Sequence, residues 1–350
     1  MFNTCRKIFF SICVFSICIQ LNAQENLLIN TYNRSVKSLN GDWNYIVDPY
    51  ENGFYNYRYE PFENQENPGN GAFFTNAKPK DKTDLVEYDF DLSDVIQVPS
   101  DWNTQKENLF YYEGTVWYKK SFDYLKTNQE NRVFVYFEAV NYQADVYFNG
   151  KKLGTHIGGF TPFNFEVTEL LKESDNFLIV KVDNKRKKEA VPTLNTDWWN
   201  YGGITRDVKL VEVSNNYIQD YFIQLNPKNN QQIKGFVQLK GTDISEKEIL
   251  ITIPELKIKK KVLTNTQGIA SIEIKSKKIN YWSIQNPYLY TVVLTTESDE
   301  IKDQIGFRTI KTKGQEILLN DEKIFLKGIS IHEESPIKGG RGSSIEDAQQ

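Results

Sequence analysis

The chain contains few of the residues that most often hold metals or form covalent links. Its 350 residues include three cysteines, two histidines and one methionine, and the cysteines Cys5, Cys13 and Cys18 all lie near the N-terminus. A chain without later cysteines has no disulfide framework, so its stability must come from a packed core. Because no phosphate loop, zinc-ligand spacing or Ser-His-Asp order stands out, we expect no cofactor and no metal.

A large excess of charge is also missing. The 42 basic and 46 acidic residues give a net charge of -4. The chain therefore lacks the excess of positive charge that attracts a phosphate backbone. Nucleic acid is therefore not expected as a partner, and a neutral or weakly charged ligand fits better.

Long apolar runs occur only at the N-terminus. Arg6 and Lys7 precede an apolar run over residues 8–19, and Ala23 follows at a cleavage-like position. This pattern predicts a signal peptide over residues 1–23, with export to the periplasm or the exterior and no membrane association after its removal. A lipid anchor on Cys18 is the alternative, although the residues before it are not the usual small ones.

Strand patterns dominate the rest of the chain. Runs of β-branched and aromatic residues predict strands, and Asn149-Gly150 predicts a tight hairpin turn. Thr168 is expected to cap a helical turn over Thr168–Glu173, and the Asn-, Pro- and Gly-rich stretch Tyr50–Lys82 is expected to be a loop. The predicted strands are 116–122, 132–140, 144–150, 177–184 and 206–213. The fold class is therefore mainly β.

A second series of strands begins at Tyr217, with turn residues roughly every 8 to 12 positions, as in a small sandwich. About 100 residues suit one immunoglobulin-like domain. The lysine-rich run Lys257–Lys261 is interrupted by Ile258 and is expected to be a solvated strand face.

The last segment differs from the strands before it in its pattern of apolar residues. Lys323–Ile331 (KIFLKGISI) is apolar almost throughout, which predicts a strand buried on both faces of a parallel sheet. The SSIEDAQQ segment predicts the start of a helix, with Ser343 or Ser344 as its N-cap.

Eight motifs are spread along the chain and cover essentially all of it after the leader. They are LNGDWNY, VPSDWN, YYEGTVWYKKSF, GGFTPFNFEVTELL, DWWNYGGITRDVKLVEV, YWSIQNPYLYTVVL, IGFRTIK and LNDEKIFLKGISIHEES. With these motifs the chain resembles glycoside hydrolase family 2, the β-galactosidases, β-glucuronidases and β-mannosidases. The short YYEGTVWYKK and NYGGI stretches look most like the β-glucuronidase branch.

The resemblance implies three domains after the signal peptide. These are a jelly-roll sugar-binding β-sandwich over residues 24–214, an immunoglobulin-like β-sandwich over residues 215–312, and the start of a truncated (β/α)₈ barrel over residues 313–350. It also implies a carbohydrate partner, with assembly into a homo-oligomer left open.

The resemblance further implies retaining hydrolysis of terminal β-glycosides by two glutamates. In the family pattern both glutamates follow Gln350, so we expect no catalytic residue in this chain and no activity from it alone. Glu333 and Glu334 are not expected to form the pair, because neighbouring side chains on a strand point to opposite faces.

The resemblance implies substrate-binding roles for Asp197, His332, Glu333, Trp198 and Tyr201. Asp197 would accept hydrogen bonds from sugar hydroxyls, and His332 would meet the sugar near the end of the first barrel strand. By residue type alone, Asp197 suits a turn cap, the aromatic residues suit a core and His332 suits a structural role. A β-galactosidase and a non-catalytic carbohydrate-binding module are the alternative functions, and an adhesin sandwich is a third.

Overall fold

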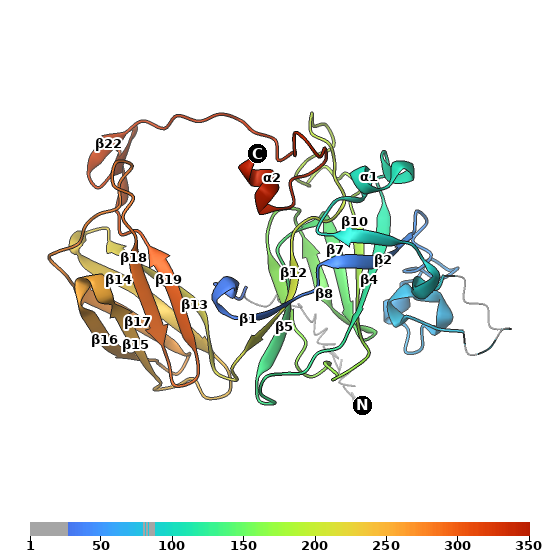
Figure 1. Ribbon diagram of the computed structural model, residues 1–350, viewed down its shortest axis with the longest axis horizontal. Helices are drawn as coiled ribbons and strands as arrows, with labels where there is room; N and C mark the ends of the chain where they lie inside the picture. The colour runs from blue at the N-terminus through green and yellow to red at the C-terminus, as the bar shows by residue number, and fades with distance from the viewer. Residues whose placement is uncertain (1–26, 80, 82, 84–87) are drawn as a thin grey trace, which may run out of the picture.

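The computed structural model describes residues 27–79, 81, 83 and 88–350, which form two β-sandwiches followed by a C-terminal segment (Figure 1). The predicted signal peptide and the three cysteines lie outside the described residues. In the described part of the chain, no helix is long and apolar enough to cross a membrane.

The first sandwich follows the predicted strands. Its strands are β1 Ser35–Ser38, β2 Gly41–Val47, β3 Val95–Val98, β4 Thr115–Phe122, β5 Arg132–Phe137, β7 Gln143–Phe148, β8 Lys151–Ile157, β9 Phe163–Glu166, β10 Asn176–Asp183 and β12 Val208–Val213. One sheet has the order β1-β12-β5-β9 and the other β3-β2-β4-β10-β7-β8, with all pairings antiparallel. The short strands β6 Val140–Asn141 and β11 Gly203–Ile204 pair beside them.

The core of this sandwich lies between the two sheets. Strand alternation sends Val116 and Tyr118 of β4 inward and Trp117 to the opposite face. Asn149 and Gly150 have φ values of 50° and 81° between β7 and β8, which confirms the predicted hairpin turn.

The predicted loop after Tyr50 covers the outer face of the six-stranded sheet. Its turns are η2 Phe62–Asn64, η3 Gly69–Gly71 and η4 Phe73–Thr75. The Phe74 and Tyr147 rings stack with centroids 4.6 Å apart, and Phe73 lies 5.6 Å from Trp117. Burial on both faces explains the apolar runs Val116–Tyr118 in β4 and Val146–Phe148 in β7.

The helical turn expected from Thr168 is a single turn with a different start. The Leu171 N–H donates to the Val167 carbonyl at 2.9 Å. The Thr168 hydroxyl accepts from the Val133 N–H at 3.0 Å, so it serves β5 instead of capping a helix. The expectation of Thr168 as an N-cap was wrong because this sheet edge competes for its oxygen.

The second sandwich has the three-plus-four strand arrangement of an immunoglobulin-like domain. Its strands are β13 Tyr217–Asn226, β14 Asn229–Lys240, β15 Glu248–Ile253, β16 Ile258–Leu263, β17 Ile269–Lys275, β18 Tyr290–Thr295 and β19 Glu300–Ile305. They form the sheets β13-β14-β17 and β16-β15-β18-β19. Lys259, Lys260 and Lys261 are exposed on β16, as predicted for a solvated face.

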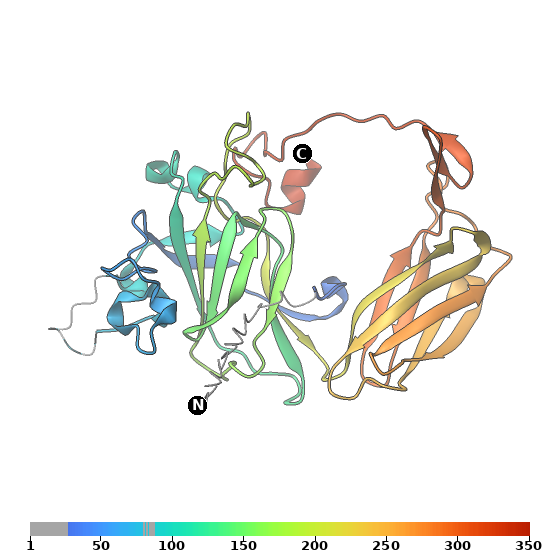
Figure 2. The same ribbon diagram turned by 180° about the vertical axis from the view of Figure 1, so that it is seen from behind.

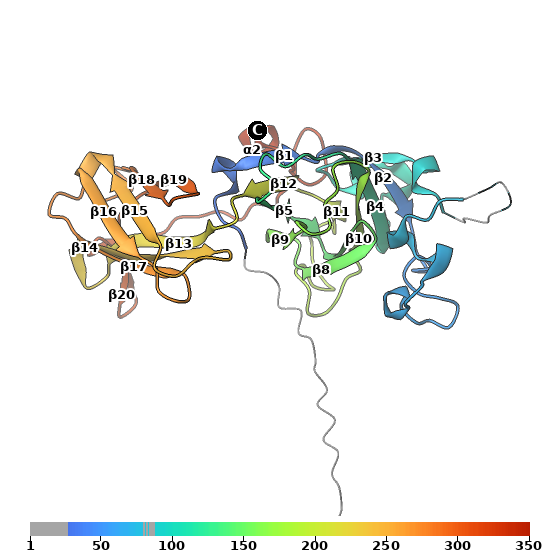
Figure 3. The same ribbon diagram turned by 90° about the horizontal axis from the view of Figure 1, so that it is seen from below.

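The N-terminal residues of the first sandwich contact the second one (Figure 3). Arg34 follows the turn η1 Thr31–Asn33, and its Nη1 lies 3.2 Å from a carboxylate oxygen of Asp299. The Asn30 amide donates to the Tyr221 hydroxyl at 2.9 Å. These contacts join the two sandwiches at positions far apart in the sequence.

The C-terminal segment leaves the second sandwich and returns to the first (Figures 1 and 2). It begins with a small sheet of β20 Ile310–Lys313, β21 Glu316–Leu319 and β22 Glu322–Ile324. It ends with α2 Ile345–Gln349, whose N-cap Ser344 forms a capping box with Asp347. The predicted helix start is therefore confirmed.

The strand predicted over Lys323–Ile331 was wrong beyond Ile324. Residues 325–333 have no regular structure, and Phe325 and Ile329 are 80% and 84% exposed. An apolar sequence forms a strand only where an edge offers backbone partners, and β21 pairs with β22 only up to Ile324. The barrel strand implied by the resemblance is thus not formed here.

Candidate functional site

A long loop between β10 and β11 is closed at its base by two buried asparagines. The Asn184 side-chain amide donates to the Asn200 carbonyl at 3.0 Å, and the Asn200 amide donates to the Asn184 carbonyl at 2.6 Å. Both residues are buried, so these reciprocal bonds satisfy backbone groups that water cannot reach. The two asparagines therefore fix the base of the loop, from which residues 185–199 project. We call this base the Asn184–Asn200 neck.

Neighbouring residues hold this neck on the sandwich. The Gly202 N–H donates to the Asn103 side-chain oxygen at 2.9 Å, beside the helix α1 Trp102–Gln105. Gly203 has φ 134°, and an added Cβ would lie 3.0 Å from the Ser100 carbonyl oxygen and the Tyr118 hydroxyl. Gly203 therefore allows a close backbone approach that a side chain would obstruct.

The C-terminal segment is pinned against the same end of the sandwich. The Arg341 backbone N–H donates to Asp101 at 3.2 Å, and its guanidinium donates to the Gly159 carbonyl at 2.9 Å. The Tyr201 hydroxyl donates to Glu334 at 3.0 Å. Burial and the neighbouring Glu334 raise the pKa of Tyr201, so it stays a neutral donor.

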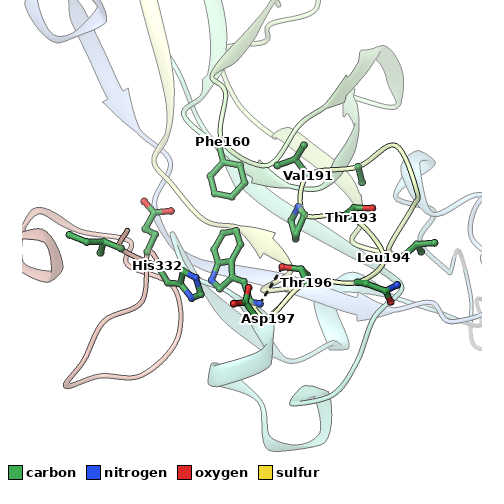
Figure 4. Close-up of a pocket in the computed structure, with 13 residues that line it drawn as sticks. Phe160, Val191, Thr193, Leu194, Thr196, Asp197 and His332 are labelled. Carbon is green, nitrogen blue, oxygen red and sulfur yellow. Dashed lines mark hydrogen bonds between the residues drawn. The ribbon is translucent and has the colours of Figure 1, made fainter. Parts of the chain in front are cut away.

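The loop and the C-terminal segment line one open cavity of about 1070 Å³. Figure 4 shows Asp197 of the loop and His332 of the C-terminal segment at this cavity. Trp198 of the loop and Glu333 of the C-terminal segment also line it. The structure thus brings together four of the five residues to which the sequence assigned sugar binding. The remaining lining residues are Phe160, Ala190, Val191, Pro192, Thr193, Leu194, Asn195, Thr196 and Ile331.

Aromatic rings form one wall of this cavity. Phe160 and Trp198 are stacked with centroids 5.3 Å apart and planes 26° apart. The His332 ring lies 6.3 Å from Trp198 at 45°. Aromatic faces suit the C–H face of a sugar ring, and the exposed Asp197 carboxylate suits its hydroxyls.

The two adjacent glutamates of the segment have different partners. Glu333 pairs with Arg206 and accepts from the Arg341 Nε at 3.0 Å, whereas Glu334 accepts from Tyr201. Arg206 therefore forms an ion pair with the C-terminal segment, whereas its neighbour Asp207 accepts from the Asn40 amide at 3.0 Å. Glu333 lines the cavity, and the two arginines compensate the negative charge of its carboxylate.

Tyr201 is placed differently from the other predicted site residues. It is 9% exposed and does not line the cavity. Its role in the structure is the hydrogen bond that its hydroxyl donates to Glu334. Trp199 packs instead with Phe110 and Tyr111, at centroid distances of 4.9 and 5.6 Å.

Sequence reasoning missed Phe160 and the Asn184–Asn200 neck. Phe160 directly follows Gly158 and Gly159, and this glycine pair was the available signal for a residue at a sharp turn. Nothing local indicated that its ring would meet Trp198.

His156 has the structural role expected of it. It is buried, its ring stacks on Phe163 at 4.1 Å, and its Nε2 lies 3.0 Å from the Thr161 hydroxyl. Burial lowers its pKa. Among the residues that the structure describes, no group of three or more His, Cys, Asp or Glu side chains could hold a metal ion.

Two family models match the chain. The sugar-binding domain of glycosyl hydrolases family 2 matches residues 36–214, and a second family 2 domain matches residues 216–308. Together they cover both sandwiches.

Curated relatives carry glycosidase names. The chain is 29% identical to a β-galactosidase of Thermoanaerobacter pseudethanolicus over 75% of its own length and 38% of the relative's. It is 25% identical to a β-glucuronidase of Paenibacillus borealis over 89% of its length and 51% of the relative's. The chain thus spans between about a third and a half of these relatives.

Solved structures share the fold. A β-glucuronidase of Bifidobacterium dentium, complexed with coumarin-3-O-glucuronide, matches 90% of this chain and 55% of its own with a TM-score of 0.72 at 24% identity. An uncultured Clostridium β-glucuronidase matches 93% of this chain and 53% of its own with a TM-score of 0.70 at 23% identity. At these identities the likeness shows the fold alone.

Proposed function

The chain belongs to glycosyl hydrolase family 2, and from this premise we propose that it binds the terminal sugar of a β-glycoside for retaining hydrolysis. A β-glucuronide is the preferred substrate class, since the relatives and structural neighbours include β-glucuronidases. A β-galactoside is the second candidate, supported by the relatives with that name.

One observation carries the proposal. A loop of the first sandwich and a segment from beyond the second sandwich place Asp197, Trp198 and His332 around one cavity. A carboxylate accepts sugar hydroxyls, an imidazole exchanges hydrogen bonds with them, and an indole packs against the ring. A volume of about 1070 Å³ exceeds what one monosaccharide needs, so an aglycone or a second sugar also fits.

In this proposal the chain positions the sugar, and the two catalytic carboxyl groups come from other residues of the intact enzyme. Retaining hydrolysis needs two carboxyl groups about 5 Å apart across the scissile bond. Glu333 does not suit either role, because Arg206 and Arg341 hold it as a paired anion. We therefore expect the 350-residue chain to bind glycosides without turning them over.

Calorimetry with methyl β-D-glucuronide and methyl β-D-galactoside tests the proposal. We expect saturable binding of one glycoside, weakened about tenfold or more by Asp197→Asn, since a hydrogen bond to a charged group contributes roughly 1.5–3 kcal/mol. Asp220→Asn is the matched control, because Asp220 lies on β13 of the second sandwich. Absence of binding, or equal weakening by both variants, contradicts the proposal.

Turnover distinguishes the enzyme from a pure binding module. The chain and a longer product of the same reading frame are compared on 4-nitrophenyl β-D-glucuronide and the matching galactoside. We expect turnover only from the longer product. Glycoside binding without turnover by both proteins supports the binding module instead.

We also propose that the protein is exported, on the strength of the basic and apolar pattern of residues 1–23. N-terminal sequencing of the mature protein from its native host is expected to begin at Gln24. A lipid-modified Cys18 at the new N-terminus supports the anchor alternative, and an intact Met1 contradicts both.

A further inference from the structure

A second cavity, of about 390 Å³, shares Phe160 with the first. It lies between the first sandwich and the C-terminal segment, and the turn η1 contributes to its wall. Its lining residues are Asn30, Thr31, Tyr32, Tyr136, Glu138, Ala139, Phe160, Pro162, Arg206 and Arg341. We call it the arginine cavity, because two guanidinium groups line it.

Arg341 is buried there with an unused donor. Its side chain is 1% exposed, its Nε donates to Glu333 at 3.0 Å and one Nη donates to the Gly159 carbonyl at 2.9 Å. Its guanidinium carbon lies 4.4 Å from the centroid of the Phe160 ring. The other nitrogen, Nη1, is buried and has no hydrogen-bond partner among the described residues.

Arg206 also pairs with Glu333, although its side chain is 41% exposed. Its Nη2 pairs with the second carboxylate oxygen of Glu333. Its Nε is buried and, within the part of the chain that the structure describes, also lacks a hydrogen-bond partner. Two arginines that line one cavity thus each carry an unused guanidinium donor.

The charges around this cavity are unevenly paired. Arg206 and Arg341 share the single carboxylate of Glu333. The buried Asp101 carboxylate, which accepts from the Arg341 backbone N–H, offsets part of the remaining positive charge. Glu138 adds little, because its carboxylate lies 2.8 Å from the Lys209 ammonium. Burial first, and then the charge of Arg206, lower the pKa of Arg341 to about 10, so Arg341 remains cationic at neutral pH.

Buried unpaired guanidinium N–H groups are costly and are normally satisfied by a ligand, water or carboxylate. Arginine donors suit the oxygens of a carboxylate or sulfate better than those of a neutral hydroxyl. A cavity of this size holds such a group together with part of the sugar that carries it.

We propose that the arginine cavity binds an oxyanionic group, a carboxylate or a sulfate, through Nη1 of Arg341 and Nε of Arg206. Phe160 lines both cavities, and Glu333 joins both arginines to the wall of the first. The group therefore belongs to an acidic carbohydrate whose neighbouring unit occupies the first cavity. This identification of the carrier, but not the anion site itself, rests on the proposed function.

Calorimetry on the 350-residue chain, at constant ionic strength set with sodium chloride, tests the site with sodium sulfate, sodium D-glucuronate and D-glucose. We expect at least one anion to bind and glucose to leave the arginine cavity empty. Sulfate binding alone indicates a sulfate ester as the natural group. Glucuronate binding that Arg206→Gln weakens and Asp197→Asn does not indicates a uronic acid. Absence of binding by both anions overturns the proposal.

Arg206→Gln removes Nε and one charge, and we expect it to weaken anion binding about tenfold, the effect of losing one charge-assisted hydrogen bond. Arg58→Gln is the matched control, because it removes the same charge from a surface loop where Arg58 stacks on Tyr57. Equal weakening by both variants means diffuse attraction and overturns the proposal. If Arg206→Gln melts at a much lower temperature, Arg206→Lys keeps the charge without Nε and is again expected to weaken binding.

Asp197→Asn separates this inference from the proposed function. It is expected to bind sulfate like the parent chain, because Asp197 does not line the arginine cavity. Anion binding sensitive to Arg206 but without any glycoside binding upholds the anion site and contradicts the proposed function. Glycoside binding sensitive to Asp197 without any anion binding does the reverse.

Discussion

The two sandwiches are built from similar strands but bury different chemistry. In the first, charged side chains lie at or below 8% exposure, among them Lys119, Asp145, Lys181 and Glu212. In the second, the buried polar residues among those described are Gln219, Thr264 and Thr309, with no buried charge. The core of the second consists of aliphatic residues with Tyr290 and Phe307.

By this difference, the first sandwich is the domain that shapes the candidate site. The second sandwich is the spacer that carries the chain to the C-terminal segment. Buried charges cost stability unless they are paired, so they persist where they fix geometry. In the first sandwich they tie loops and the C-terminal segment to the sheets, as Asp101 does for Arg341. The second sandwich buries no charged residue among those described, and it places the start of that segment.

The largest expected contrast comes from removing one lysine from each sandwich. Lys181 is 5% exposed and lies 3.0 Å from Glu51 and 3.8 Å from Asp145. Lys181→Met leaves these acids without their buried partner and is expected to cost about 3–5 kcal/mol of unfolding free energy in urea titrations.

Lys261→Met is the matched variant in the second sandwich. Lys261 pairs with Glu248 at 2.8 Å, but both side chains are more than half exposed. The expected cost is about 0–1 kcal/mol. Equal costs for the two variants break the comparison between the sandwiches.

A smaller contrast is expected from the pH dependence of stability. Burial disfavours the charge of Glu212, but hydrogen bonds from Thr127, Tyr124 and Asn131 outweigh it and lower the pKa below its ordinary value of 4.5. A lowered pKa gives stability that is present above the ordinary value and is lost as pH falls through the folded value.

Glu212→Gln is therefore expected to cost about 1–3 kcal/mol at pH 7, and the difference from the parent chain is expected to shrink below pH 4.5. Urea titrations from pH 7 to pH 3 measure it. Glu273→Gln on the exposed face of the second sandwich is the control, with an expected change within about 0.5 kcal/mol. A constant difference for Glu212→Gln across this range refutes the assignment.

The smallest contrast concerns the attachment of the C-terminal segment. Tyr201→Phe removes the hydroxyl that donates to Glu334, and we expect a cost of about 1 kcal/mol. The change should appear as faster amide exchange in residues 333–341. Tyr111→Phe, at a ring that is 82% exposed, is expected to leave that exchange unchanged, and identical rates in all three proteins contradict the role of Tyr201.

The strands of both sandwiches were predictable because alternation and turn residues are local properties of the sequence. The Asn149-Gly150 turn and the Ser344 cap were predictable for the same reason, because each depends on a few neighbouring residues. The strand over Lys323–Ile331 was not, because apolar residues indicate a tendency to be buried, while a strand also needs a paired edge.

The candidate site was only partly predictable for the same reason. Motifs indicated Asp197 and His332, but the stacking of Phe160 on Trp198 depends on how distant loops meet. The placement of Tyr201 outside the cavity depends on Glu334, which the sequence offered no means to locate. The unused donors of Arg206 and Arg341 appear only once the C-terminal segment is seen folded back.

The central claim is that the loop from the first sandwich and the returning segment form one sugar-binding cavity. A crystal structure of the chain soaked with methyl β-D-glucuronide tests it most directly. We predict the sugar ring between Asp197 and His332, with its C–H face toward Trp198. Clear density for the glycoside elsewhere, with this cavity empty at a saturating concentration, would contradict the account.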